Sequence, residues 1–310
     1  MNNASKWLQS ILSLLSPPSY KCLTCGELGQ PSPLSPILCE TCAAHIPWIR
    51  TVRCLTCGRH VGCPDCTRSR EPSPILCNRS AVAYSSVMRE WLGQYKYRGN
   101  EQYAPLLGLM LERAYQMLRA EHEELIRQNN PHSCATSFTK FFRTRRGHPF
   151  FGSPYIDSWQ ADILVPVPVS ESRLIERGFN QAERLAIELS KRTGIPVLPL
   201  LKRIQHTDKQ SFKGRAERLF AMKHAFGTDA STHEYYSEWL IANMNTLSTS
   251  SVSLEPSISD TQQSRPVRII IVDDIYTTGS TLRACAESII QMTKAYPFPC
   301  DIYSLTWARS

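Results

Sequence analysis

The stretch from Val267 to Met292 constrains the fold more than any other part of this 310-residue chain. Its first residues, Val267–Val272, are mostly apolar and β-branched. They predict a short strand that is buried on both faces, as in a parallel sheet. Apolar residues then recur at helical spacing from Leu282 to Ile290, which predicts a helix. A strand, a turn and a helix in this order indicate an α/β fold, in which ligands bind beyond the carboxyl ends of the strands.

The turn in this stretch combines two acids with small and hydroxyl-bearing residues. Asp273 and Asp274 follow the strand directly, and Gly279 lies close to the helix start. The hydroxyl-bearing residues are Thr277, Thr278, Ser280 and Thr281. A helix start offers free N–H groups and partial positive charge to a phosphate, and glycine lets the backbone approach it closely. Because carboxylates accept hydrogen bonds from a ribose diol, directly or through the water shell of a metal, the turn fits a 5-phosphorylated ribose.

Two other interpretations of this stretch remain open on these residues alone. An apolar strand followed by two acids is also typical of a Walker B strand. That interpretation requires a Gly-rich loop ending in Gly-Lys-Ser/Thr, and the sequence contains none. The simpler alternative is an ordinary turn whose acids face solvent.

The stretch resembles the motif that binds phosphoribosyl pyrophosphate (PRPP) in type I phosphoribosyltransferases. In that motif an apolar strand is followed by Asp-Asp, a short loop and Thr-Gly-x-Thr, and residues 278–281 read Thr-Gly-Ser-Thr. The resemblance implies that Asp273 and Asp274 bind the ribose hydroxyls and that residues 277–281 bind the 5-phosphate. It also implies that PRPP binds together with Mg²⁺.

A second pattern of strand, loop and helix runs from residue 163 to residue 194. Ile163–Val165 predicts a buried strand, and apolar spacing from Ala182 to Leu189 predicts a helix. The loop between them carries Arg173, Arg177 and Gly178. Guanidinium groups bind pyrophosphate oxygens in bidentate pairs, and glycine permits an unusual backbone conformation beside a ligand. In phosphoribosyltransferases the corresponding loop holds pyrophosphate.

Eight of the twelve cysteines form four Cys-x-x-Cys pairs near the N-terminus. The pairs are Cys22/Cys25, Cys39/Cys42, Cys54/Cys57 and Cys63/Cys66. Two pairs complete a tetrahedral four-thiolate zinc site, so the spacing favours two zinc ribbons in tandem, with one or two structural Zn²⁺ ions. Interleaved pairing, a redox dithiol and an Fe–S cluster stay open as alternatives. Such ribbons either contact nucleic acid or protein, or are purely structural.

Three separated motifs that follow the cysteine pairs in the sequence extend the resemblance. They are Val165-Pro166-Val167-Pro168, Arg177-Gly178-Phe179-Asn180-Gln181, and the Asp-Asp-Ile-Tyr-Thr-Thr-Gly loop at residues 273–279. Together with the cysteines they resemble the ComF family, which includes competence and GntX-like proteins. Residues 202–218 resemble that family's Arg-rich flexible segment, which implies a hood over the site. The family is implicated in DNA uptake and natural transformation.

These patterns predict an α/β, type I phosphoribosyltransferase-like domain, with a mostly parallel sheet flanked by helices, behind a small zinc-ribbon module. We assign residues 1–20 to an N-terminal amphipathic helix, 21–78 to the double zinc ribbon and 79–310 to the α/β domain. Polar, aperiodic stretches at about 120–158 and 228–264 are expected to be inserts. No stretch approaches the ~20 apolar residues of a membrane span, and no export signal is evident, so a cytoplasmic protein is expected.

Two functions follow as expectations. The first is a phosphoribosyltransferase that moves the phosphoribosyl group from PRPP to an unknown acceptor, with Asp273, Asp274 and Arg177 as catalytic residues. The second is a non-catalytic sensor of PRPP or a nucleotide that binds single-stranded DNA or competence proteins. The net charge of +8 suits nucleic acid and small anions equally. A structural adaptor with an inactive site is a third interpretation, and the intact acids and hydroxyls of the turn oppose it.

Overall fold

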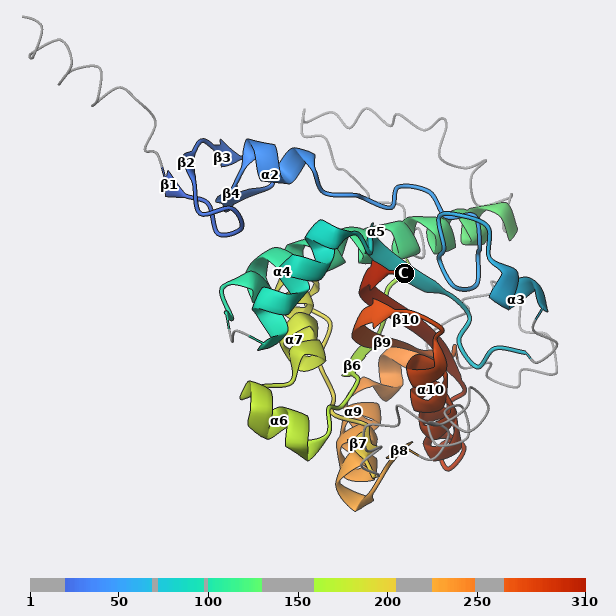
Figure 1. Cartoon of the computed structure of the whole chain (residues 1–310). Helices are drawn as coiled ribbons and strands as arrows, with labels where there is room; N and C mark the ends of the chain where they lie inside the picture. The colour runs from blue at the N-terminus through green and yellow to red at the C-terminus, as the bar shows by residue number, and fades with distance from the viewer. Residues whose placement is uncertain (1–19, 69–71, 98–99, 130–158, 205–224, 249–264) are drawn as a thin grey trace, which may run out of the picture.

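The computed structural model contains one central sheet of four parallel strands (Figure 1). The strands are β5 (Asn78–Ala83), β6 (Ile163–Pro166), β9 (Val267–Tyr276) and β10 (Cys300–Arg309), in the spatial order β5-β10-β9-β6. The structure describes residues 20–68, 72–97, 100–129, 159–204, 225–248 and 265–310. This confirms the expected α/β class with a parallel sheet.

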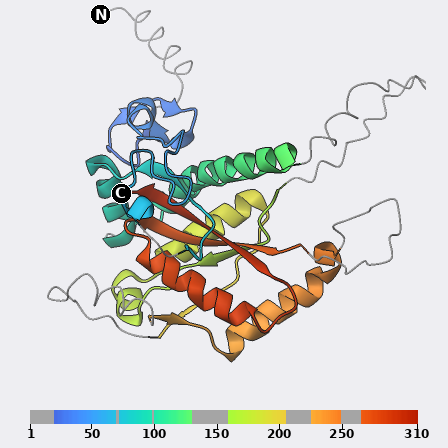
Figure 2. The same ribbon diagram turned by 90° about the vertical axis from the view of Figure 1, so that its right-hand side faces the viewer.

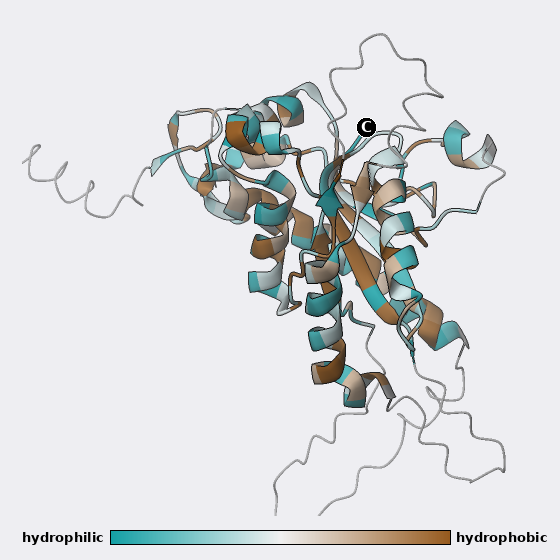
Figure 3. Ribbon diagram, turned by 90° about the horizontal axis from the view of Figure 1, so that it is seen from below, coloured by the Kyte–Doolittle hydropathy of each residue, from teal (hydrophilic) through white to brown (hydrophobic). Residues whose placement is uncertain are grey.

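Helices cover both faces of the sheet and form three layers (Figure 2). On one face, α5 (Tyr103–Asn129) and α7 (Gln181–Thr193) pack on the strands, with α4 (Ser86–Tyr97) against α5. On the other face lie α10 (Ser280–Thr293) and, beside it, α9 (Ala230–Ser248). Figure 3 shows that the strands between these layers are predominantly hydrophobic, whereas hydrophilic residues lie on the outer faces of the helices.

Strand β9 explains how one sheet supports two cores. Ile270 and Val272 point into the core under α5 and α7, whereas Ile269 and Ile271 point into the core under α10. All four side chains are fully buried because successive residues of a strand alternate between its faces. The same alternation sends Asp273 and Asp274 to opposite faces. The strand therefore continues through both acids to Tyr276, although the apolar run alone predicts an end at Val272.

The cysteine-rich region forms two small units, one at the upper left and one at the right of Figure 1. The first contains the strand pairs β1 (Tyr20–Lys21) with β2 (Leu28–Gly29) and β3 (Pro31–Ser32) with β4 (Ser35–Cys39), followed by α2 (Glu40–Ala44). The second contains α3 (Pro64–Arg68). Cys22 and Cys39 of the first unit join the core under α5, while Cys57 of the second joins the core under α10.

The first residues of the first expected insert are helical rather than irregular. Residues 120–129 were assigned to the insert at 120–158, but α5 continues to Asn129. Three contacts stabilise the last turns of α5. His122 stacks on Trp159, Ile126 packs against the core, and Arg119 forms an ion pair with Glu123, four residues later. Residues 130–158 lie outside the described part of the chain.

The first half of the second expected insert is helical rather than irregular. Residues 230–248 of the predicted stretch 228–264 form helix α9. Tyr236, Leu240 and Leu247 are buried against the core under α10, and this burial overrides the polar composition of the segment. Residues 249–264 lie outside the described residues.

The predicted N-terminal amphipathic helix, and most of the Arg-rich segment between β7 (Lys202–Arg203) and β8 (Phe226–Gly227), also lie outside the described residues. These two short strands pair with each other in an antiparallel ribbon. Within the described residues, each helix is too short or too polar to cross a membrane.

Candidate functional site

The turn between β9 and α10 has the geometry of an anion-binding helix start. Gly279 takes a left-handed conformation, with a φ of 77°, and is the residue before α10. A Cβ atom at this position would lie 2.2 Å from the Tyr276 hydroxyl oxygen, so only glycine fits without moving the ring. Within the described residues no side chain caps this helix start, which leaves the first N–H groups of α10 available to a ligand.

The predicted hydroxyl residues lie around this helix start. Thr277 and Thr278 are exposed, whereas Ser280 and Thr281 are half-buried. The Thr278 Oγ1 and Ser280 Oγ atoms are 3.1 Å apart and hydrogen-bond to each other. The turn therefore presents hydroxyl and N–H donors on one side of Gly279, as phosphate binding requires.

The two adjacent acids have different environments. Asp274 is buried and forms an ion pair with Lys96 from the end of α4. Its backbone N–H donates to Asp273 Oδ1 at 2.8 Å. Asp273 is half-buried on the opposite face of β9. Burial and the negative charge of Asp274 raise the pKa of Asp273 to about 7, although Lys96 and Arg173 oppose the shift.

Lys96 is a site residue that the sequence patterns did not identify. In the sequence, Lys96 belongs to a short basic run at residues 96–100 that contains a glycine. Such a run suits an anion, but it is also typical of an ordinary solvated turn. Instead the Lys96 ammonium group neutralises an acid that is distant in the sequence. The available signal was a lysine in the last turn of a predicted helix, which is common at any helix end. Residues 98 and 99 lie outside the described residues.

Arg177 and Gly178 lie at the end of a helix where the sequence predicted a loop. Helix α6 (Glu171–Arg177) forms because Ser170 caps its start by accepting a hydrogen bond from the Arg173 N–H. Gly178 ends it in a left-handed conformation, with a φ of 78°. The predicted unusual backbone at this glycine is therefore present, one residue beyond a helix rather than within a loop.

The Arg177 guanidinium group is placed near Lys96 through an aromatic neighbour. Its Cζ atom lies 5.1 Å from the centre of the Tyr97 ring, and Tyr97 follows Lys96. The Arg177 Nε and Nη1 atoms are buried and have no hydrogen-bond partner among the described residues. Burying guanidinium donors without hydrogen-bond partners costs free energy, and an anionic ligand would supply those partners. Lys96 pairs with Asp274, and the adjacent Tyr97 contacts Arg177, so Arg177 lies on the same side of the sheet's carboxyl end as this pair.

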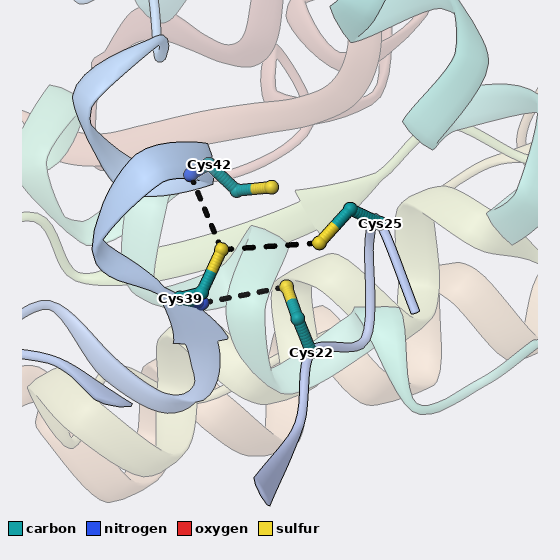
Figure 4. A group of neighbouring side chains, drawn as sticks. All are labelled: Cys22, Cys25, Cys39 and Cys42. Atoms are coloured by element: carbon teal, nitrogen blue, oxygen red, sulfur yellow. Dashed lines mark hydrogen bonds between the residues drawn. The ribbon is translucent and has the colours of Figure 1, made fainter. Parts of the chain in front are cut away.

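The eight paired cysteines gather into two clusters, which suit metal binding. Cys22, Cys25, Cys39 and Cys42 form one, and Cys54, Cys57, Cys63 and Cys66 form the other; within each, the sulfur atoms lie within 4.8 Å of one another. The Cys25 and Cys39 sulfurs are 3.9 Å apart (Figure 4), and the Cys57 and Cys63 sulfurs 3.4 Å. Tetrahedral Zn–S bonds of 2.3 Å place sulfurs about 3.8 Å apart. The first pair groups with the second and the third with the fourth, so the interleaved alternative is wrong.

The thiol chemistry of the first cluster also favours a cation. Burial raises the pKa of Cys22, but hydrogen bonds from the Cys25 backbone and the Thr24 side chain outweigh it and lower the pKa to about 6. Burial, together with the neighbouring Cys39, raises the pKa of Cys42 to about 12. Four thiolates this close repel one another, and a divalent cation removes that repulsion. Gly26 and Gly58 take left-handed conformations after the first and third pairs, as expected for metal knuckles.

The isolated cysteines lie apart from these clusters. Cys77 and Cys285 are buried, and Cys300 is half-buried beside Thr293. Cys134 falls outside the described residues. His45 and His60, which lie among the cysteine pairs in the sequence, belong to neither cluster.

Comparison with known proteins finds sequence similarity to proteins that are named competence proteins. The chain is 26% identical to competence protein ComFC of Bacillus subtilis over 88% of its own length and 84% of that protein. It is 22% identical to ComFC of Streptococcus pneumoniae over 84% and 90% of the two chains. It is 30% identical to competence protein F of Haemophilus influenzae over 41% and 43%. No established family profile matches the chain. Two of these three similarities, those to the ComFC proteins, extend over most of both chains.

Proposed function

We propose that the chain binds PRPP with Mg²⁺ at the carboxyl end of β9 and transfers its phosphoribosyl group to an acceptor. One observation carries the proposal. The acid pair and the uncapped start of α10 are joined by a turn that requires glycine. Ribose hydroxyls and a 5-phosphate lie at the opposite ends of a phosphoribosyl group, and this turn offers acceptors at one end and donors at the other.

Each residue then has a definite task. Asp273 and Asp274 accept hydrogen bonds from the ribose hydroxyls, either directly or through Mg²⁺-bound water. Residues 277–281 and the first N–H groups of α10 hold the 5-phosphate. Arg177 donates to the pyrophosphate, and Gly178 lets the backbone approach it. Mg²⁺ would supply positive charge to the pyrophosphate oxygens when bound.

The transfer follows from charge placement. The bond between ribose C1 and the pyrophosphate oxygen breaks as the acceptor forms a new bond to C1, and positive charge develops on the ribose. The unpaired donors of Arg177 stabilise the negative charge that accumulates on departing pyrophosphate. The ion pair with Asp274 neutralises the positive charge of Lys96, which would otherwise repel the positive charge that develops on the ribose.

The biological role that fits is competence, because the three similar proteins are named competence proteins. The same similarity, with a net charge of +8, favours one second candidate. In that candidate the turn senses PRPP or a nucleotide without turnover, and the cysteine units and basic surface contact single-stranded DNA or other competence proteins.

Pyrophosphate release separates these two functions. Zinc-loaded protein is incubated with PRPP, Mg²⁺ and a panel of nucleobases and amines, and pyrophosphate is measured. Transfer predicts release that depends on one class of acceptor and is lost in Asp273→Asn. Asp301→Asn, at the opposite end of the sheet, is the matched control and should retain release. PRPP binding without release for any acceptor would favour the sensor.

A further inference from the structure

The second cysteine cluster, Cys54 to Cys66, is docked closely on the sheet. The Asn78 backbone N–H of β5 donates to Thr56 O at 2.7 Å, and Asn78 Nδ2 donates to Cys57 O at 3.2 Å. A Cβ atom on Gly58 would lie 2.4 Å from Asn78 O. The knuckle that carries Cys57 therefore has little freedom to move relative to the strands.

One buried arginine joins this cluster to the candidate ligand turn. Arg309 lies at the end of β10, opposite Tyr276 in β9, and is 2% exposed. Its Nε atom donates to Cys57 O at 3.2 Å, and its Nη2 atom donates to Cys57 Sγ at 3.4 Å. Its Nη1 atom donates to Tyr276 O and Thr277 O, each at 3.0 Å, and also to Ser310 O.

The same guanidinium group also fixes the ring that defines the turn. The Arg309 Cζ atom lies 4.5 Å from the centre of the Tyr276 ring. The Tyr276 hydroxyl in turn leaves room only for glycine at position 279. Arg309 thus holds two carbonyl oxygens and the aromatic wall of the turn, while two of its other nitrogens hold a cysteine of the cluster.

We propose that Arg309 is a positioning residue through which a metal in the second cluster sets the ligand affinity of the turn Tyr276–Gly279. This rests on the proposed function, in which the turn binds the 5-phosphate of PRPP. A metal fixes the Cys57 sulfur as a thiolate, and a guanidinium donates a strong charge-assisted hydrogen bond to it. This hydrogen bond fixes the orientation of the guanidinium plane. The plane in turn orients the carbonyl groups of Tyr276 and Thr277, which lie just before Thr278 and Gly279.

The first cluster provides an internal comparison. It packs against the opposite core, where the Tyr103 hydroxyl of α5 donates to Leu23 O at 3.2 Å. Within the described residues, the hydrogen bond given above connects it to α5 rather than to the turn. Metal in the first cluster should therefore leave the turn unaffected.

Linkage between the two sites gives a test that needs no substitution in Arg309. If metal favours ligand binding, ligand must favour metal binding by the same factor. The Cys42→Ser variant removes a ligand of the first cluster, so that the remaining zinc reports on the second. In equilibrium competition with a chelator, Mg²⁺–PRPP should raise the affinity for this zinc about tenfold. In Cys66→Ser, which leaves the first cluster intact, PRPP should not change the affinity for zinc.

Substitution then tests the residue itself. Arg309→Gln should retain both zinc ions and weaken PRPP binding about tenfold, and Arg309→Lys should recover part of that loss. With Co²⁺ in the second cluster, PRPP should shift the thiolate-to-metal absorption band in Arg309-containing protein and not in Arg309→Gln. Arg79→Lys is the matched control, because Arg79 donates to Leu55 O beside the same cluster and pairs with Glu121, away from the turn.

The outcomes separate the two proposals. If zinc-loaded wild type does not bind PRPP, the proposed function fails and this inference fails with it. If wild type binds PRPP, but Arg309→Gln binds equally well and PRPP leaves the zinc affinity of the second cluster unchanged, the inference alone is overturned.

Discussion

Asp273 and Asp274 are neighbours in the sequence with opposite energetic roles. Asp274 has a lysine partner in a buried pair, whereas Asp273 is held beside that acid with its pKa raised to about 7. A carboxyl group usually titrates near 3.9, so the folded protein binds this proton more tightly than the unfolded chain does. Stability is therefore lost as pH rises from about 4 to about 7.

Asp273→Asn is accordingly expected to stabilise the protein while removing a ribose acceptor. The gain should be about 1–2 kcal/mol at pH 8, after allowance for partial exposure, and smaller at pH 5. Urea unfolding at the two pH values measures it, and PRPP binding should be lost in the same variant. Lower stability of the variant at pH 8 would contradict this account of Asp273.

Asp274→Asn is expected to have the opposite effect on stability. It leaves the Lys96 ammonium group, which is 14% exposed, without its carboxylate, which costs about 2–4 kcal/mol. Lys96→Met combined with Asp274→Asn should recover most of that loss. Glu124→Gln breaks an ion pair with Arg127 that is about half exposed, and should change stability by less than about 0.5 kcal/mol. Equal effects of the buried and exposed substitutions would contradict the assignment.

Among the elements, two glycines with the same backbone conformation separate conformational cost from steric cost. Gly194, which ends α7, and Gly279 have φ values of 75° and 77°. A Cβ atom on Gly194 meets nothing within 4 Å, whereas one on Gly279 meets the Tyr276 ring. Gly194→Ala should cost about 1 kcal/mol of stability only. Gly279→Ala should also weaken PRPP binding at least about tenfold, because the ring and the turn must move. Similar binding by both variants would show that the turn tolerates the displacement.

Local patterns were sufficient for some elements and not for others. The run Val267–Val272 predicted β9 because a strand buried on both faces needs apolar residues throughout. Helix α9 was missed because its burial depends on Tyr236 and Leu247 reaching a core built by distant strands. Sequence patterns did not predict helix α6 because most of its residues are exposed, so they show no apolar periodicity.

At the scale of the whole molecule, cysteine spacing predicted the grouping of the clusters because each Cys-x-x-Cys pair is a local turn. The contacts Lys96–Asp274 and Arg309–Cys57 join residues far apart in the chain, and no local pattern reports them. Sequence reasoning therefore located the turn and the acids but not the basic residues that position them.

The separation of the clusters predicts the metal content. The intact protein should contain about two zinc ions per chain, and Cys42→Ser or Cys63→Ser should each reduce this to about one. Native mass spectrometry measures the count directly. Loss of both ions in a single variant would show that the clusters form one coupled site rather than two.

Calorimetric titration can show whether PRPP binds on the turn after β9. Mg²⁺–PRPP is titrated into zinc-loaded wild type, into the double variant Asp273→Asn/Asp274→Asn, and into Asp301→Asn. We expect saturable binding by wild type and Asp301→Asn and no binding by the double variant. Absence of heat with folded, zinc-loaded wild type, or equal binding by the double variant, would rule out PRPP binding at this turn.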